Sequence, residues 1–152
     1  MPEKTTLERA RRDAAEGKSA STQAGEFVRE EMEHIREGKH GARNTKQAIA
    51  IGLSKARRAG VKLPAPKKGS SSSATRQKAK RDLQRGQRGR KRPASPRRAR
   101  AVERALKREP HRAASHRALA KQARQSARRR GPKARSRAAQ KAARNRQHER
   151  RR

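Results

Sequence analysis

The alternation of apolar and polar positions is clearest in the segment GEFVREEMEHIREG, where it predicts an amphipathic helix. Val28, Met32 and Ile35 stand at positions i, i+4 and i+7, with Phe27 beside them, so these side chains share one face of an α-helix. Gly38 follows as a residue that commonly ends helices. The opposite face carries several glutamates, which are expected to be exposed to solvent.

A second amphipathic helix is predicted from Thr45 to Gly60, with Asn44 as its N-cap. The two helices would form a hairpin. Gly52 lies inside the second helix, where glycine costs about 1 kcal/mol relative to alanine, and this favours a close approach of another backbone. The predicted core of the hairpin is Phe27, Val28, Met32, Ile35, Ile49, Leu53 and Ala56.

The N-terminal region is predicted to form a short helix over residues 5–16. Thr5 and Glu8 fit the capping-box pattern, and Gly17 stands where a left-handed residue ends a helix. Leu7 is the only bulky apolar residue within this helix. We therefore expect the helix to be loosely docked or free.

The hairpin is small, with nine bulky apolar residues between Phe27 and Leu63. A unit of this size is expected to need a third helix, a ligand or a partner to be well ordered, and a homodimer formed through the hairpin is one of these alternatives. Ile51 points away from the apolar stripe. It is expected either to be covered by residues 61–64 or to face a second subunit.

From residue 65 the pattern is lost in a Pro/Gly/Ser-rich linker, which is followed by Ala/Arg/Lys stretches at residues 74–85, 96–109 and 111–150. Alanine, arginine and lysine favour helix, but repulsion between like charges and the lack of an apolar face favour disorder. The predicted fold class is all-α, with a short helical hairpin and a largely disordered, helix-prone basic tail. The predicted domains are residues 1–19, 20–64 and 65–152.

Charge is distributed unevenly along the chain, whose formal net charge is +34. Residues 1–37 carry 7 Lys and Arg against 9 Asp and Glu, whereas residues 38–152 carry 40 against 4. A surface this positive attracts polyanions. Of the 33 cations after residue 64, 24 are arginine, whose planar guanidinium binds phosphate oxygens bidentately.

Several classes of protein are disfavoured by what the sequence lacks. There is no cysteine, which excludes disulfides and thiolate metal sites. The histidines, His34, His40, His111, His116 and His148, are spaced too irregularly for a metal site and are expected at the surface. A hairpin this small cannot build the dry pocket that catalysis requires, so neither an enzyme nor a cofactor is predicted. No apolar run approaches the ~18 residues of a membrane span, and a cytoplasmic, nucleoid-associated protein is expected.

Candidate nucleic-acid-binding residues are basic side chains in the hairpin loop and the tail. They are Lys39, Arg43, Lys46, Arg88, Arg90, Lys91, Arg92, Arg97, Arg98, Arg128, Arg129 and Arg130. The loop at residues 38–44 precedes a helix N-terminus, where free N–H groups favour a phosphate; the alternative is that its glycines only shape the turn. Residues 95–98, Ser-Pro-Arg-Arg, resemble a turn of histone tails, and residues 88–93 resemble an interrupted AT-hook, both of which favour the minor groove.

The near absence of aromatic residues favours duplex DNA over RNA or single strands. Proteins that read single strands stack bases on aromatic side chains, and here there is one, Phe27. The sequence therefore predicts non-specific binding of duplex DNA by the tail, with the hairpin serving self-association or protein contact. The alternative is a protein-interaction or adaptor module whose tail only retains it on RNA, ribosomes or DNA.

The segment EFVREEMEHIREGKHGARNTKQAIAIGLSKARRAGVKLP resembles a small bacterial and phage domain family of unknown function. The features that carry the resemblance are the Gly-Lys-His-Gly loop and the run KQAIAIGLSKARRAG that follows it. The resemblance covers residues 20–64 and implies a helical module without implying an activity. The remainder resembles the linker-histone-like and protamine-like tails of bacterial nucleoid proteins.

Overall fold

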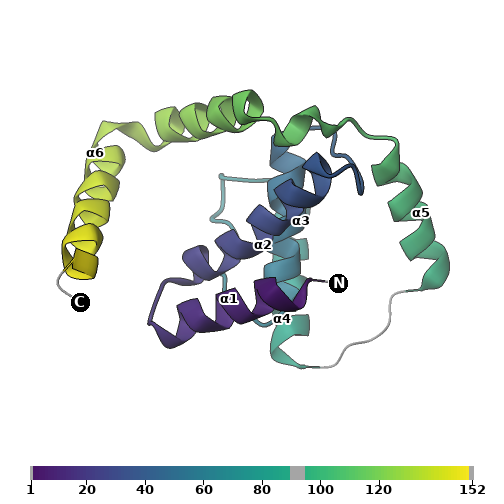
Figure 1. Cartoon of the computed structure of the whole chain (residues 1–152), viewed down its shortest axis with the longest axis horizontal. Coiled ribbons are helices and arrows are strands. Elements are labelled where there is room, and N and C mark those ends of the chain that lie inside the picture. Colours follow the sequence, from purple (N-terminus) through teal and green to yellow (C-terminus); the bar gives the residue numbers. More distant parts are fainter. Residues whose placement is uncertain (1, 90–94, 151–152) are drawn as a thin grey trace. The chain divides into compact units, whose positions relative to one another are not determined.

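All regular elements are helical in the computed structural model, which describes residues 2–89 and 95–150 apart from the side chains of 145 and 148–150 (Figure 1). The all-α class is thus confirmed for this part of the chain. In chain order the elements are α1 (Lys4–Ala15), α2 (Ala20–Arg36), α3 (Thr45–Arg58), α4 (Ser73–Gln87), α5 (Pro96–Lys107), the 3₁₀ turn η1 (His111–Ala114) and α6 (His116–Arg150).

Helices α2 and α3 form the hairpin that the sequence predicts, and their ends follow the expected capping chemistry. The side chain of Asn44 accepts a hydrogen bond from the backbone N–H of Gln47 at 2.9 Å, which caps α3. Gly38 and Gly60 follow the two helices with φ of 75° and 101°, a backbone conformation that glycine adopts without strain. Gly52 contacts the backbone of α2: a Cβ at this position would lie 2.7 Å from Val28 Cα, as its position within the helix indicated.

The core lies between α1, α2 and α3, and alanine supplies much of it. Phe27 and Ile35 are fully buried. Of the other residues predicted for the hairpin core, Met32 and Ala56 are also buried, and Val28, Ile49 and Leu53 are partly buried. The glutamate face of α2 differs from the expectation, because Glu30 and Glu31 are both buried.

The first helix is docked, and the expectation of a loose or free helix is wrong. It packs along α2, burying Thr6, Ala10 and Asp13. Leu7 packs against the core together with the small residue Ala10, and a count of bulky residues does not detect the contribution of Ala10. The predicted capping box also does not form, since Glu3 is the N-cap and makes no side-chain cap hydrogen bond.

Helix α4 packs against α3, so the folded unit continues beyond the predicted boundary at residue 65. Ala79 and Asp82 face inwards, and the hydroxyl of Ser54 donates a hydrogen bond to the carboxylate of Asp82. Gly86 lies against the last turn of α3, where an added Cβ would be 2.0 Å from the carbonyl oxygen of Arg57. Together, α1 and α4 supply the additional helices that the hairpin was expected to need.

The end of α5 and the segment after it cover the loop between α2 and α3. The backbone N–H of Gly41 donates to Leu106 O at 2.9 Å and that of Ala42 to Pro110 O at 3.2 Å. The 3₁₀ turn η1 then contacts α2 and α3, burying Ala113 and Ala114.

Contacts divide the chain into two compact units, Met1–Ser115 and His116–Arg152. The second unit contains α6, which is kinked at Gly131, where φ is 75° and ψ is 168°, just before Pro132. The prediction of a largely disordered tail is wrong for the described residues, since α4, α5 and α6 account for most of them. Helix-forming propensity prevails here over the repulsion between like charges.

Candidate nucleic-acid interface

The first stretch of α6 carries a row of exposed cations on one face. Arg117, Lys121, Arg124 and Arg128 are separated by four, three and four residues, the spacing that places side chains above one another on a helix. At 1.5 Å per residue, a cation recurs roughly every 5 Å along this face.

The second stretch of α6 repeats the arrangement after the kink at Gly131. Lys133, Arg137, Lys141 and Arg144 are separated by four, four and three residues, and all are exposed. These two rows are called the α6 basic rows below. Among the side chains that the structure describes, the cations of both rows form no ion pair.

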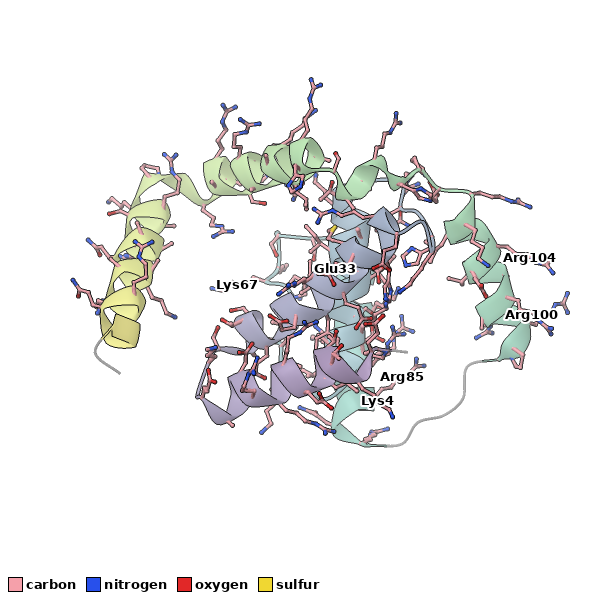
Figure 2. All side chains as sticks on the ribbon, viewed as in Figure 1. Lys4, Glu33, Lys67, Arg85, Arg100 and Arg104 are labelled. Carbon is pink, nitrogen blue, oxygen red and sulfur yellow. The ribbon has the colours of Figure 1, made fainter. Side chains whose placement is uncertain are left out.

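The other candidate residues lie in several places. Exposed positions are occupied by Arg43, Lys46, Arg88, Arg97, Arg98, Arg128, Arg129 and Arg130. Arg90, Lys91 and Arg92 fall outside the described residues, as does most of the resemblance to an AT-hook. The segment Ser-Pro-Arg-Arg begins α5, with Pro96 in its first turn, and is not a separate turn. Figure 2 shows Arg100 and Arg104 of α5 extending away from the helix.

Several N–H groups in the loop at residues 38–44 and at the start of α3 already have acceptors. The N–H groups of Gly41 and Ala42 donate to the end of α5 and to the segment after it, and Asn44 caps Gln47. Lys39 is also engaged: its Nζ lies 2.9 Å from Glu37, and the hydrogen bond with this carboxylate raises the pKa of Lys39. Phosphate binding at the start of α3 stays a prediction, as does the alternative that the glycines only shape the turn.

A cluster of Glu31, His34 and His40 could hold a metal ion, since one ligand atom from each lies within 4.8 Å of the others. The side chains of His34 and His40 are only 13% and 16% exposed, so the expectation that both are surface residues is wrong. Glu31 comes from α2, as does His34, and the loop brings His40 to them. Lys55 of α3 places its Nζ 2.7 Å from Glu31 Oε2.

The surroundings of this cluster are polar and partly open. A cavity of about 330 Å³ adjoins it, and Val102 and Leu106 of α5 line the cavity together with Ile51. Ile51 is partly buried, and the two alternatives predicted for it stay predictions. Nearby, a hydrogen bond with His34 lowers the pKa of Glu3.

Residues 17–68 match the model of a family of unknown function (DUF6496), about a third of the chain. The matched part contains α2, α3 and the loop between them, and therefore the Glu31, His34 and His40 cluster. No curated protein and no solved structure matches the chain. Within the described residues, no helix has the length and apolar character that crossing a membrane requires.

Two groups of residues were missed in the sequence. The α6 basic rows were not recognised beyond Arg128, although the spacing of three and four residues between cations marks them. The metal-capable cluster was missed because only the spacing of the histidines was considered, whereas Glu31, three residues before His34, belongs to the set. The approach of His40 to these residues depends on the loop conformation, which the sequence pattern does not specify.

Proposed function

We propose that this protein binds nucleic acid, and duplex DNA in particular, through phosphate contacts made by the α6 basic rows. The observation that carries the proposal is the exposure of both rows without a compensating carboxylate among the described side chains. Residues 116–150 contain 13 Lys and Arg and one acidic residue. Such a helix is attracted most strongly to a partner that is itself densely anionic.

The geometry of the rows suits a duplex backbone. Duplex DNA presents a negative charge every ~1.7 Å along its axis, so a straight row with a cation roughly every 5 Å meets phosphates along its length. The kink at Gly131 divides α6 into two such rows. Phosphate contacts position a protein without reading bases, and low sequence specificity follows.

Single-stranded nucleic acid is the less suitable partner. The single aromatic side chain of the sequence, Phe27, is fully buried in the core, so it cannot stack on an unpaired base. Because base stacking contributes ~1 to 3 kcal/mol per base to single-strand binding, its absence favours a duplex. Association with the nucleoid would follow from non-specific duplex binding.

A pair of charge variants tests the role of α6. In the first, Arg117, Lys121, Arg124 and Arg128 are replaced by glutamine. In the control, four exposed cations of the first unit that are not candidate binding residues are replaced in the same way: Lys4, Arg11, Arg58 and Lys62. Both variants lose the same formal charge. Affinity for a short labelled duplex is measured by fluorescence anisotropy.

The α6 variant should bind at least about tenfold more weakly than the control. It makes fewer phosphate contacts, so its binding releases fewer counterions from the DNA. Equal affinities for the two variants would show that total charge, and not the α6 rows, determines binding. A wild-type protein that does not bind the duplex at low salt would overturn the proposal itself.

A second candidate function is a protein-interaction module, which is favoured by the position of the family match within residues 17–68, away from α6. Because α4 and η1 pack on the hairpin, the truncation that separates the two functions ends at Ser115, where the first unit ends. If residues 1–115 replace the full chain in a deletion strain, the basic helix is ancillary and the module interpretation is favoured.

A further inference from the structure

The region around Glu31 has an excess of negative charge in a chain that is otherwise strongly positive. Contacts of 3.5 Å or less connect the carboxylates of Glu3, Glu30, Glu31 and Glu37 to two ammonium groups, those of Lys39 and Lys55. Glu3 and Glu37 are exposed, but Glu30 and Glu31 are buried and share the ammonium group of Lys55, which leaves a formal charge of −1 among these three groups. Burial of uncompensated charge is costly, so the region favours an additional cation.

Glu31 is the centre of this region, and its contacts with neighbouring groups are ion pairs without good hydrogen-bond geometry. Its side chain is fully buried, and neither carboxylate oxygen accepts a hydrogen bond. Lys55 Nζ approaches Oε2 at 2.7 Å and His40 Nε2 approaches Oε1 at 3.4 Å; both are within ion-pair distance, but neither has hydrogen-bond angles. Buried carboxylates without well-oriented hydrogen-bond donors are uncommon, and a bound ion would give Glu31 a further partner.

The hydrogen bonds of His40 determine which of its nitrogens faces Glu31. Nδ1 lies 3.1 Å from the carbonyl oxygen of Gly41, which can only accept, so Nδ1 carries the proton. In the neutral ring, Nε2 then directs a lone pair towards an oxygen of Glu31. Two such lone pairs at 3.4 Å repel one another unless a proton or a metal ion lies between them.

The distance between these two atoms also suits a shared ion. Two ligands of one tetrahedral zinc ion, each about 2.0–2.1 Å from the metal, are separated by about 3.3 Å, and His40 Nε2 and Glu31 Oε1 are 3.4 Å apart. His34 completes the set within 4.8 Å. Its Nε2 lies 2.8 Å from Glu3 Oε1, which leaves the other ring nitrogen available as a ligand.

We propose that Glu31, His34 and His40 bind one divalent transition-metal ion of the zinc type. Two imidazoles and one carboxylate form a common ligand set for zinc, whereas magnesium and calcium prefer oxygen ligands alone. Each of the three residues also has an outer contact. His40 contacts the carbonyl of Gly41, His34 contacts Glu3, and the second oxygen of Glu31 contacts Lys55. Such contacts orient metal ligands in proteins. The ion would fasten the α2–α3 loop, on which the segment after α5 docks, to α2.

The proposal is tested with the full chain, made without a histidine tag, freed of nucleic acid with nuclease and high salt, and stripped with a chelator. Zinc chloride is titrated by calorimetry into the wild type, His34→Ala, His40→Ala and the matched control His116→Ala, which alters an exposed histidine of the second unit. The wild type and the control should bind one zinc ion per chain. Each cluster variant should bind at least about tenfold more weakly, as loss of even an outer contact can do.

Magnesium at the same concentration should give no heat of binding at this site. Equal zinc affinities of His40→Ala and His116→Ala, or no zinc binding by the wild type, would overturn the proposal. Since a cluster variant could lose its fold, X-ray absorption of the zinc-loaded wild type provides an independent measurement. A spectrum with two imidazole ligands supports the site, and one without imidazole contradicts it. The result is independent of DNA binding, because the cluster and α6 lie in different units.

Discussion

At Gly52 the backbone of α3 meets the backbone of α2, and the absence of a side chain permits this approach. A Cβ added there would lie 2.7 Å from Val28 Cα and 3.0 Å from Phe27 O, and backbone atoms cannot move aside as the end of a side chain can. Gly25 of α2 provides the opposite case, since nothing lies within 4 Å of a Cβ at that position. Substitutions at these two positions therefore measure different effects on stability: close packing at Gly52 and helix propensity at Gly25.

Replacing each of these glycines by alanine should change stability in opposite directions. Gly52→Ala should lower the free energy of unfolding by about 1–3 kcal/mol, the usual cost of overpacking. Gly25→Ala should raise it by about 0.5–1 kcal/mol, because alanine favours helix. Urea denaturation followed by circular dichroism measures both; stabilisation by Gly52→Ala would show that α2 and α3 do not approach as described.

At the scale of elements, α4 shows how a basic segment joins the folded unit. Its inward face is made by Ala79 and Asp82, and Gly86 allows it to reach the carbonyl of Arg57. Arg57 is itself buried; its guanidinium donates to Leu63 O and Pro64 O at 3.2 Å each. Burial lowers the pKa of Arg57, and the nearby charge of Asp82 partly opposes this.

Gly86→Ala should undock α4, because its Cβ would lie 2.0 Å from a backbone oxygen of α3. Hydrogen exchange should show loss of amide protection in α4, with a decrease of about 1–3 kcal/mol in stability. Gln84→Ala, at an exposed position of the same helix, serves as the control and should be nearly neutral. If Gly86→Ala leaves α4 as protected as in the control, α4 does not pack on α3 in solution.

The elements that could be predicted from the sequence are those with bulky periodic residues and clear caps. Helices α2 and α3 met both conditions, through Phe27, Ile35 and the Asn44 cap. The docking of α1, α4 and η1 could not be predicted in this way, because they contact the core through small or polar residues such as Ala10, Asp82 and Ala114. The same limitation applies to the metal-capable cluster, which depends on a loop conformation.

At the scale of the whole chain, the described acids and bases have different roles. The carboxylates of the first unit are largely used within it, as in the contacts of Lys55 with Glu30 and Glu31 and of Arg9 with Glu26. The α6 basic rows have no such internal partners among the described residues. Exposed cations such as Arg11 and Arg58 also lie in the first unit, but the cations of α6 are arranged in rows along one helix. This arrangement is the reason why the proposed function places binding in the second unit.

The most direct test of this account is the salt dependence of binding by the full chain to duplex DNA. If six to ten phosphates are neutralised, affinity should fall by ~10³ to 10⁵ between ~50 and ~200 mM salt, with a straight line on logarithmic axes. The glutamine variant of the first α6 row should give a slope smaller by about three to four units, because it lacks four cations. An affinity that is nearly constant over this range would contradict binding through phosphate contacts.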